Sequence, residues 1–316
     1  MDLFRSVQAV ADTDDGGIID WDSVAAAAKA GTPKGDLDLS AEEQAGYRND
    51  VRDARDRLRS VGEVEFDLPE TIEIQHRHHW IDANIETFRR VVEPLESTPT
   101  MLPTVSRTIN TGTMALTLGF LGRNVMGQYD PLLLADRGDH ALYFVLPNIR
   151  RVAGQLDVAY PRFRRWIAFH EVAHAAEFGA APWLPEYLET RMQGSVTALS
   201  EGSIETEGFQ ELMAAMTAVE GYAELLMDRA FDGEYADLRE KLDARRQSGG
   251  PFRKLMSRLL GLGLKRDQYE RGAAFFEAVA DARGLPAANA VWESPENLPT
   301  TEEIDEPTRW LGRVDP

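Results

Sequence analysis

Hydrophobic residues recur along most of the chain at intervals of three and four positions, the spacing that places them on one face of an α-helix. Residues 79–95 show the pattern well, because Trp80, Ile85 and Val92 fall on one stripe together with Ile81 and Phe88. Helices are also predicted over residues 20–29, 41–58, 109–126, 162–178, 185–199, 209–231 and 266–283. The chain is therefore expected to be mainly helical.

The helix over residues 41–58 has a defined start. Ser40 followed by Glu43 three residues later is the signature of a capping box. The helix is charged nearly all round, so it is expected to lie on the surface.

Short extended segments interrupt the helical pattern near the middle of the chain. The apolar runs 131–135 and 141–147 are separated by the turn-forming residues 136–140, which predicts a β-hairpin. The predicted fold class is therefore α+β, mainly α, with a small antiparallel sheet.

The Pro- and Thr-rich residues 97–104 are the best candidate for a domain boundary. They divide the chain into a mostly helical N-terminal region, residues 1–98, and a second domain, residues 99–316, on which it packs.

The composition narrows the range of functions. There is no cysteine, which excludes disulfides, thiolate zinc sites and iron–sulfur clusters. The formal net charge is −19, from 53 acidic and 34 basic side chains, and such a surface repels nucleic acid and anionic membranes. Only five of the basic residues are Lys, which favours a salt-adapted, halophilic source. The start lacks a secretory signal and no apolar run is long enough to cross a membrane, so a cytoplasmic location is expected.

The strongest chemical signal is the sequence His170-Glu171-Val172-Ala173-His174. On a helix, two histidines four residues apart lie on one face, where their ring nitrogens can bind one zinc ion. Glu171 is placed to polarise a metal-bound water and to carry its proton to the leaving group. The residues around the motif are uncharged, as a buried metal helix requires. We therefore predict one zinc ion per chain, with Glu171 as catalytic base.

Two histidines do not complete a metal site, so a third ligand is expected from another helix. The downstream acids are Glu201, Glu205, Glu207, Glu211, Glu220, Glu224 and Asp228. Glu220 interrupts an apolar stripe of its helix, and a carboxylate on a buried face needs a strong partner. The stripe consists of Met213, Met216, Ala223 and Met227. Glu220 is therefore the predicted third ligand.

Other residues near the predicted ligands have supporting roles. Glu224, one turn after Glu220, is predicted to hold the far nitrogen of a ligand histidine. Gly221 predicts a close approach of the two metal helices. A donor to the developing oxyanion is expected opposite the metal, and the open candidates are Tyr129, Tyr187 and Tyr222.

The remaining histidines are weaker candidates. His76, His78 and His79 are expected to be partly exposed at a junction between a strand and a helix, rather than to bind a second metal. His140 ends the predicted turn and has no partner by sequence.

The segment 170–178, HEVAHAAEF, followed by Glu220-Gly-Tyr-Ala-Glu224 resembles the prokaryotic zincin-like metallopeptidases. That family is often labelled as associated with biosynthesis of a deazaflavin coenzyme. In this chain Glu220 is followed by an acid four residues later, which is similar to the gluzincin arrangement. Further blocks that resemble the zincin-like family cover about residues 80–310. The resemblance implies a mainly helical zincin-like domain, one zinc on His170, His174 and Glu220, and Glu171 as base.

The leading hypothesis is a zinc-dependent hydrolase, a metallopeptidase acting on a peptide or another amide. The hairpin before the metal helix would present an edge strand on which an extended peptide lies. The alternative is a non-catalytic, zinc-stabilised scaffold or partner-binding protein associated with deazaflavin coenzyme metabolism. Glu171 argues against a scaffold, because a structural zinc site has four protein ligands and no use for that carboxylate. Neither the substrate nor the oligomeric state follows from the sequence.

Overall fold

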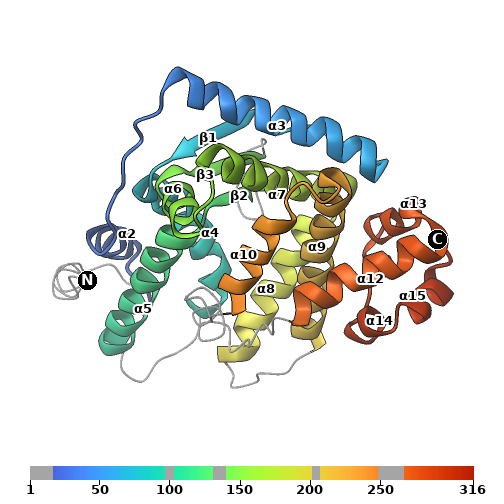
Figure 1. The fold of residues 1–316 in the computed structure, drawn as a ribbon. Helices are drawn as coiled ribbons and strands as arrows, with labels where there is room; N and C mark the ends of the chain where they lie inside the picture. The colour runs from blue at the N-terminus through green and yellow to red at the C-terminus, as the bar shows by residue number, and fades with distance from the viewer. Residues whose placement is uncertain (1–16, 97–102, 131–139, 201–206, 248–266) are drawn as a thin grey trace.

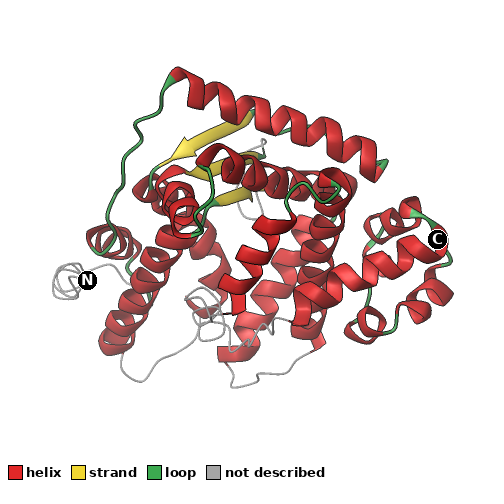
Figure 2. Cartoon of the chain, viewed as in Figure 1, coloured by secondary structure: helices red, strands yellow, loops and turns green. Residues whose placement is uncertain are grey.

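The computed structural model describes residues 17–96, 103–130, 140–200, 207–247 and 267–316 (Figure 1). Helices surround one small sheet, which lies below the long helix at the top of the molecule in Figure 2. The prediction of a mainly helical α+β fold is confirmed.

Each helix predicted from periodicity is present, with its ends shifted by a few residues. The long helices are α2 (Trp21–Ala30), α3 (Ala41–Gly62), α4 (Arg77–Glu96), α5 (Pro103–Asn124), α6 (Leu146–Gln155), α7 (Tyr160–Ala180), α8 (Leu184–Ser200), α9 (Glu207–Phe231), α10 (Ala236–Gln247) and α12 (Asp267–Arg283). Short helices follow: α13 (Leu285–Asn289), η1 (Ala290–Trp292), η2 (Pro295–Asn297), α14 (Thr301–Asp305) and α15 (Pro307–Val314). Helices α6 and α10 are additions that the sequence pattern did not predict.

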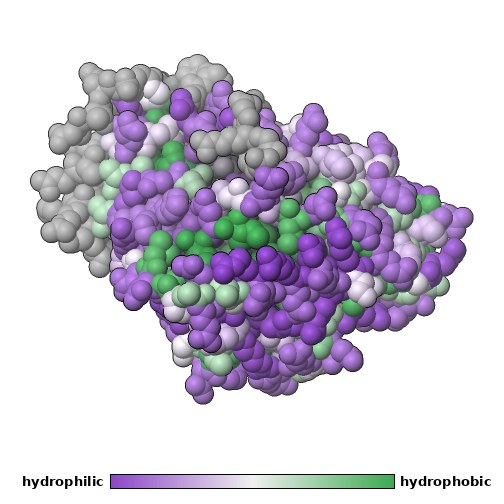
Figure 3. All heavy atoms as spheres, turned by 90° about the horizontal axis from the view of Figure 1, so that it is seen from above, coloured by the Kyte–Doolittle hydropathy of each residue, from purple (hydrophilic) through white to green (hydrophobic). Residues whose placement is uncertain are grey.

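Helix α3 begins at the predicted capping box. Ser40 Oγ accepts a hydrogen bond from the Glu43 N–H at 3.1 Å, and Glu43 Oε2 accepts one from the Ser40 N–H at 3.0 Å. The helix lies on the surface as expected, but one stripe with Tyr47, Val51 and Leu58 is buried against α7 and its neighbours. Its charged side chains belong to the upper face of the molecule, where a narrow hydrophobic strip crosses a mostly hydrophilic surface (Figure 3).

The sheet has the strand order β1-β3-β2, with β1 at Thr71–Gln75, β2 at Gly127–Asp130 and β3 at Ala141–Val145. Strands β2 and β3 are antiparallel. Strand β2 therefore ends before the predicted run 131–135. That run and residues 136–139 of the predicted turn lie outside the described residues. Strand β1 pairs with β3 in parallel, so the sheet is mixed rather than antiparallel. Four of the five β3 residues are buried, as expected for a central strand covered on both faces.

The hydrophobic core consists of two clusters. The larger joins the sheet with α3, α6, α7, α9 and α12, and the smaller joins α2, α4 and α5 with Val145 of β3. Helix α5 packs with only one face, and Ile109 and Leu116 are 61% and 51% exposed. The division between residues 98 and 99 stays a prediction, and β1 from the N-terminal side shares the sheet with β3.

No helix within the described ranges is long and apolar enough to cross a membrane. The segment 292–310 contains several short helices, and Trp292 and Trp310 are both buried.

Candidate metal centre

Helix α7 carries the HExxH motif through the centre of the larger core. Pro161 stands in its first turn, where a missing N–H costs no helical hydrogen bond. Gly179 lies inside the last turn. A Cβ on Gly179 would lie 2.9 Å from Phe66 Cβ, so this glycine allows the segment after α3 to pack closely on α7.

The three predicted ligands come together between α7 and α9. One ligand atom each from His170, His174 and Glu220 lies within 4.8 Å of the other two, and His170 Nε2 is 3.9 Å from Glu220 Oε2. Within the described part of the chain, no other group of His, Asp and Glu side chains meets this spacing. The structure therefore brings together the residues that the sequence analysis selected from two separate helices.

This cluster fits a zinc ion. Two imidazoles and one carboxylate form a donor set used by catalytic zinc sites, which keep a fourth position open. The ligand atoms of the three residues lie within 4.8 Å of one another, so one zinc ion could be held by all three. The side chains of His170 and Glu220 are 24% and 22% exposed, which leaves the centre accessible from solvent.

Glu171 lies against the edge strand of the sheet. Its Oε2 accepts a hydrogen bond from the Tyr129 N–H at 2.9 Å. A Cβ on Gly127 would lie 2.4 Å from Glu171 Oε1, so a glycine is needed for the carboxylate to sit there. Burial raises the pKa of Glu171 to about 7, against the opposing effects of His174 and the Tyr129 N–H. A carboxyl group with this pKa exchanges protons readily near neutral pH.

His174 has a partner that the sequence analysis missed. Its Nδ1 lies 2.9 Å from Oε2 of Glu177, which is three residues later on α7 and fully buried. Burial opposes the charged form of His174, but Glu177, Glu220 and Glu171 outweigh it and raise the pKa of His174 to about 10. The available signal was that Glu177 is the next charged residue after the motif, in a stretch of α7 that is otherwise apolar.

Glu224 forms an ion pair with an arginine of α10. Its Oε1 accepts from Arg239 Nη2 of α10 at 2.5 Å, and Arg239 also pairs with Asp228. The far nitrogen of His174 is held by Glu177 and not by Glu224, because Glu177 lies one turn away from His174 on the same helix. A contact between Glu224 and the other histidine stays a prediction.

The remaining downstream acids lie away from the cluster or outside the described residues. Glu211 pairs with Arg191 of α8 at 3.1 Å, and Glu207 is exposed in the first turn of α9. Glu201 and Glu205 lie outside the described residues. Glu220 therefore remains the acid that reaches the two histidines.

Helix α9 is held beside the metal centre from its other side. Gly221 was expected to allow a close approach of α7 and α9, but the close neighbour is α12. A Cβ on Gly221 would lie 2.3 Å from the backbone carbon of Gly272, and one on Gly272 would lie 2.3 Å from Thr217 O. The stripe expected to be buried opens at Met216, which is 38% exposed and lies one turn before Glu220.

The three candidate tyrosines differ in their surroundings. Tyr222 is fully buried and donates to Asn289 Oδ1 at 2.5 Å. Tyr187 packs on Arg191, whose guanidinium carbon lies 3.9 Å from the ring centroid. Tyr129 contacts His140 Nδ1 through its hydroxyl and Glu171 through its N–H. Of the three, Tyr129 is the one that directly contacts a predicted catalytic residue.

His76, His78 and His79 lie at the predicted junction, between β1 and α4. His76 Nδ1 accepts from the His79 N–H at 2.9 Å, and His78 Nε2 is 2.7 Å from Thr32 O. These contacts give two of the three rings structural roles at the start of the helix.

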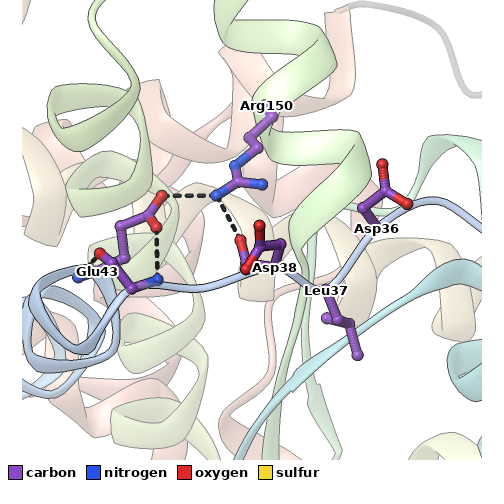
Figure 4. A pocket seen from close by; sticks show the side chains of 6 residues that line it. Asp36, Leu37, Asp38, Glu43 and Arg150 are labelled. Carbon is purple, nitrogen blue, oxygen red and sulfur yellow. Dashed lines mark hydrogen bonds and ion pairs between the residues drawn. The ribbon is translucent and has the colours of Figure 1, made fainter.

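A shallow pocket lies beside the start of α3 (Figure 4). It is lined by Asp36, Leu37, Asp38, Ser40, Glu43 and Arg150. Arg150 is already paired with Glu43 at 2.6 Å and donates to Asp38 O at 3.0 Å. Its guanidinium is therefore engaged within the protein, and the pocket does not form a second candidate site.

The chain is similar to known proteins in sequence and in structure. The chain matches the family model of the zincin-like metallopeptidases over residues 19–202 and 188–311. It is similar to a crystal structure from Chloroflexus aurantiacus described as a candidate hydrolase with a novel fold, with 30% identity and a TM-score of 0.74. That match covers 100% of this chain and 99% of the other. Among curated proteins no match is found. The chain therefore belongs to the zincin-like metallopeptidase family.

Proposed function

We propose that the protein is a zinc-dependent metallopeptidase that hydrolyses a peptide or another amide. The observation that carries the proposal is the convergence of His170, His174 and Glu220, with the carboxylate of Glu171 buried beside them. Membership of the family supports a zinc hydrolase in general, and the catalytic roles and the substrate class are the proposed part.

In this proposal His170, His174 and Glu220 hold one zinc ion per chain. Zinc in such a site lowers the pKa of a water molecule and polarises a substrate carbonyl. Glu171 takes a proton from the attacking water and passes it to the amine that leaves. The Tyr129 N–H, 2.9 Å from Oε2, orients the carboxylate for both transfers.

Strand β2 is the proposed docking edge for an extended substrate. It lies at one edge of the sheet, and the N–H of Tyr129 reaches Glu171 on α7. A peptide that pairs with the open backbone groups of such an edge would pass close to Glu171. The placement accounts for a catalytic carboxylate that contacts a strand as well as its own helix.

The alternative function is a zinc-stabilised scaffold associated with deazaflavin coenzyme metabolism. A structural zinc site is closed by four protein ligands. Within the described residues three candidate ligands meet, and two of them are more than a fifth exposed. This arrangement supports the catalytic proposal over the scaffold.

The test compares the full-length, zinc-loaded protein with Glu171→Gln on a peptide library, with cleavage followed by mass spectrometry. We expect Glu171→Gln to bind zinc as the wild type does and to cleave about 10²- to 10⁴-fold more slowly, the usual contribution of a general base. Glu211→Gln, which alters an acid paired with Arg191, is the matched control and should keep full activity. Equal activity in Glu171→Gln removes this residue from the mechanism. A zinc-loaded wild type that cleaves no peptide favours the scaffold.

A further inference from the structure

We infer that Glu177 is a positioning residue that fixes His174 with Nε2 directed to the metal, an inference that rests on the proposed function. His174 Nδ1 lies 2.9 Å from Glu177 Oε2, a distance typical of a charge-assisted hydrogen bond. Because Nδ1 is occupied, Nε2 is the nitrogen left for a metal. The imidazole is thus held in one orientation and one tautomer.

Glu177 is buried where a carboxylate needs a partner. The residue is fully buried, and an isolated charge in such a place costs several kcal/mol unless it is well paired. The ion pair that the structure gives it is with His174. Glu177 is therefore directed at one nitrogen of one predicted ligand.

The two ligand histidines are supported differently on the same helix. The ring of His170 stacks on Trp166, one turn earlier, with centroids 5.7 Å apart and planes 6° apart. His174 is supported one turn later by the carboxylate of Glu177. Helix α7 therefore carries both ligands together with a support for each. Residues that hold ligand histidines in this way typically contribute 10- to 100-fold to metal affinity.

The test measures zinc affinity of the full-length chain by competition with a chromophoric chelator. Glu177→Gln keeps an acceptor oxygen and loses the charge, whereas Glu177→Leu loses both. We expect zinc affinity to fall about 10- to 100-fold in Glu177→Leu and by a smaller factor in Glu177→Gln. The matched control is Asp50→Asn, which breaks the buried pair between Asp50 and Arg164 of α7, 2.6 Å apart, and should leave zinc affinity unchanged.

Nitrogen-15 spectra of the imidazoles in the zinc-loaded protein give a second readout. The wild type should show a slowly exchanging Nδ1–H on His174, and this signal should be lost in Glu177→Leu while the signals of His170 stay in place. A folded Glu177→Leu protein with wild-type zinc affinity overturns the inference alone. If Glu177→Leu does not fold, wild-type affinity in Glu177→Gln overturns it. A wild type that binds no zinc overturns the proposed function and, with it, this inference.

Discussion

The two helices that form the metal centre contribute to it in different ways. Helix α7 supplies both histidines and the proposed base within five residues, and Glu177 on the same helix holds His174. Helix α9 supplies Glu220 alone, and its position depends on the backbone contact between Gly221 and Gly272 of α12. One side is therefore a local motif, and the other is produced by tertiary packing. A defect in α7 should therefore affect both metal binding and the chemistry, whereas a defect in α9 should affect the assembly of the site.

The largest expected effect is the loss of metal when a ligand is removed from either α7 or α9. His174→Ala removes a ligand from α7 and Glu220→Ala removes the ligand from α9. We expect the wild type to contain one zinc ion per chain and both variants to lose it, because two protein ligands hold zinc weakly. Metal content of the three proteins, measured side by side by elemental analysis, checks this. Zinc retained in Glu220→Ala would show that α9 contributes another ligand, with Glu224 next in order.

The next largest effect is expected when Glu171 is displaced while the metal ligands stay in place. Gly127→Ala places a Cβ within 2.4 Å of Glu171 Oε1, so the carboxylate must turn away while the ligands stay in place. We expect peptide cleavage to fall about 10²- to 10⁴-fold, as for loss of a general base, with zinc content unchanged. Gly154→Ala is the control, because a Cβ there meets nothing within 4 Å. Normal cleavage by Gly127→Ala would mean that Glu171 works from another position.

A smaller effect is expected on the packing of α9. Gly221→Ala forces a Cβ to within 2.3 Å of the Gly272 backbone, and overpacking of this kind costs about 1–3 kcal/mol. Denaturant unfolding should show this loss, together with weaker zinc binding as Glu220 moves. Gly208→Ala, in the first turns of the same helix with nothing within 4 Å, is the control and should be neutral or slightly stabilising. Equal stability of the two variants would argue against the α9–α12 contact.

The smallest effect is expected at the outer end of α7, where Arg162 pairs with Asp237 of α10 at 2.5 Å. The hydrogen bond from Arg162 holds the pKa of Asp237 at about 2. A lowered carboxyl pKa stabilises the fold above the unfolded value of about 3.9, and this contribution disappears as the pH falls through about 2. Asp237→Asn should therefore lower the Tm slightly at pH 7, since exposed pairs contribute little, and have no effect at the acid limit. A large drop in Tm at pH 7 would contradict this.

The α7 side could be predicted from the sequence because its information is local. The spacing of His170 and His174 is a property of one helix, as is the capping box at Ser40. Glu220 could be selected because its charge interrupts an apolar stripe. Glu177 was missed although it lies on the same helix, because one glutamate carries no motif of its own.

Long-range contacts could not be predicted in the same way. Gly221 signals a close approach, but no residue nearby identifies α12 as the neighbour. The pairing of Glu224 with Arg239 depends on how α10 folds back. The parallel pairing of β1 with β3 joins segments on either side of α4 and α5. Each of these contacts depends on the path of the chain between distant segments, which periodicity does not record.

Strand β3 lies between two strands that precede it in the chain, and this has a consequence for fragments of the protein that lack β1. Strand β3 is strongly apolar, and β1, at Thr71–Gln75, covers one of its edges. A fragment that starts at residue 99 would leave this edge bare, and an open apolar edge recruits strands from other molecules. We expect such a fragment to aggregate unless residues 1–98 are supplied with it. In that case the five residues of β1 protect the rest of the chain from self-association.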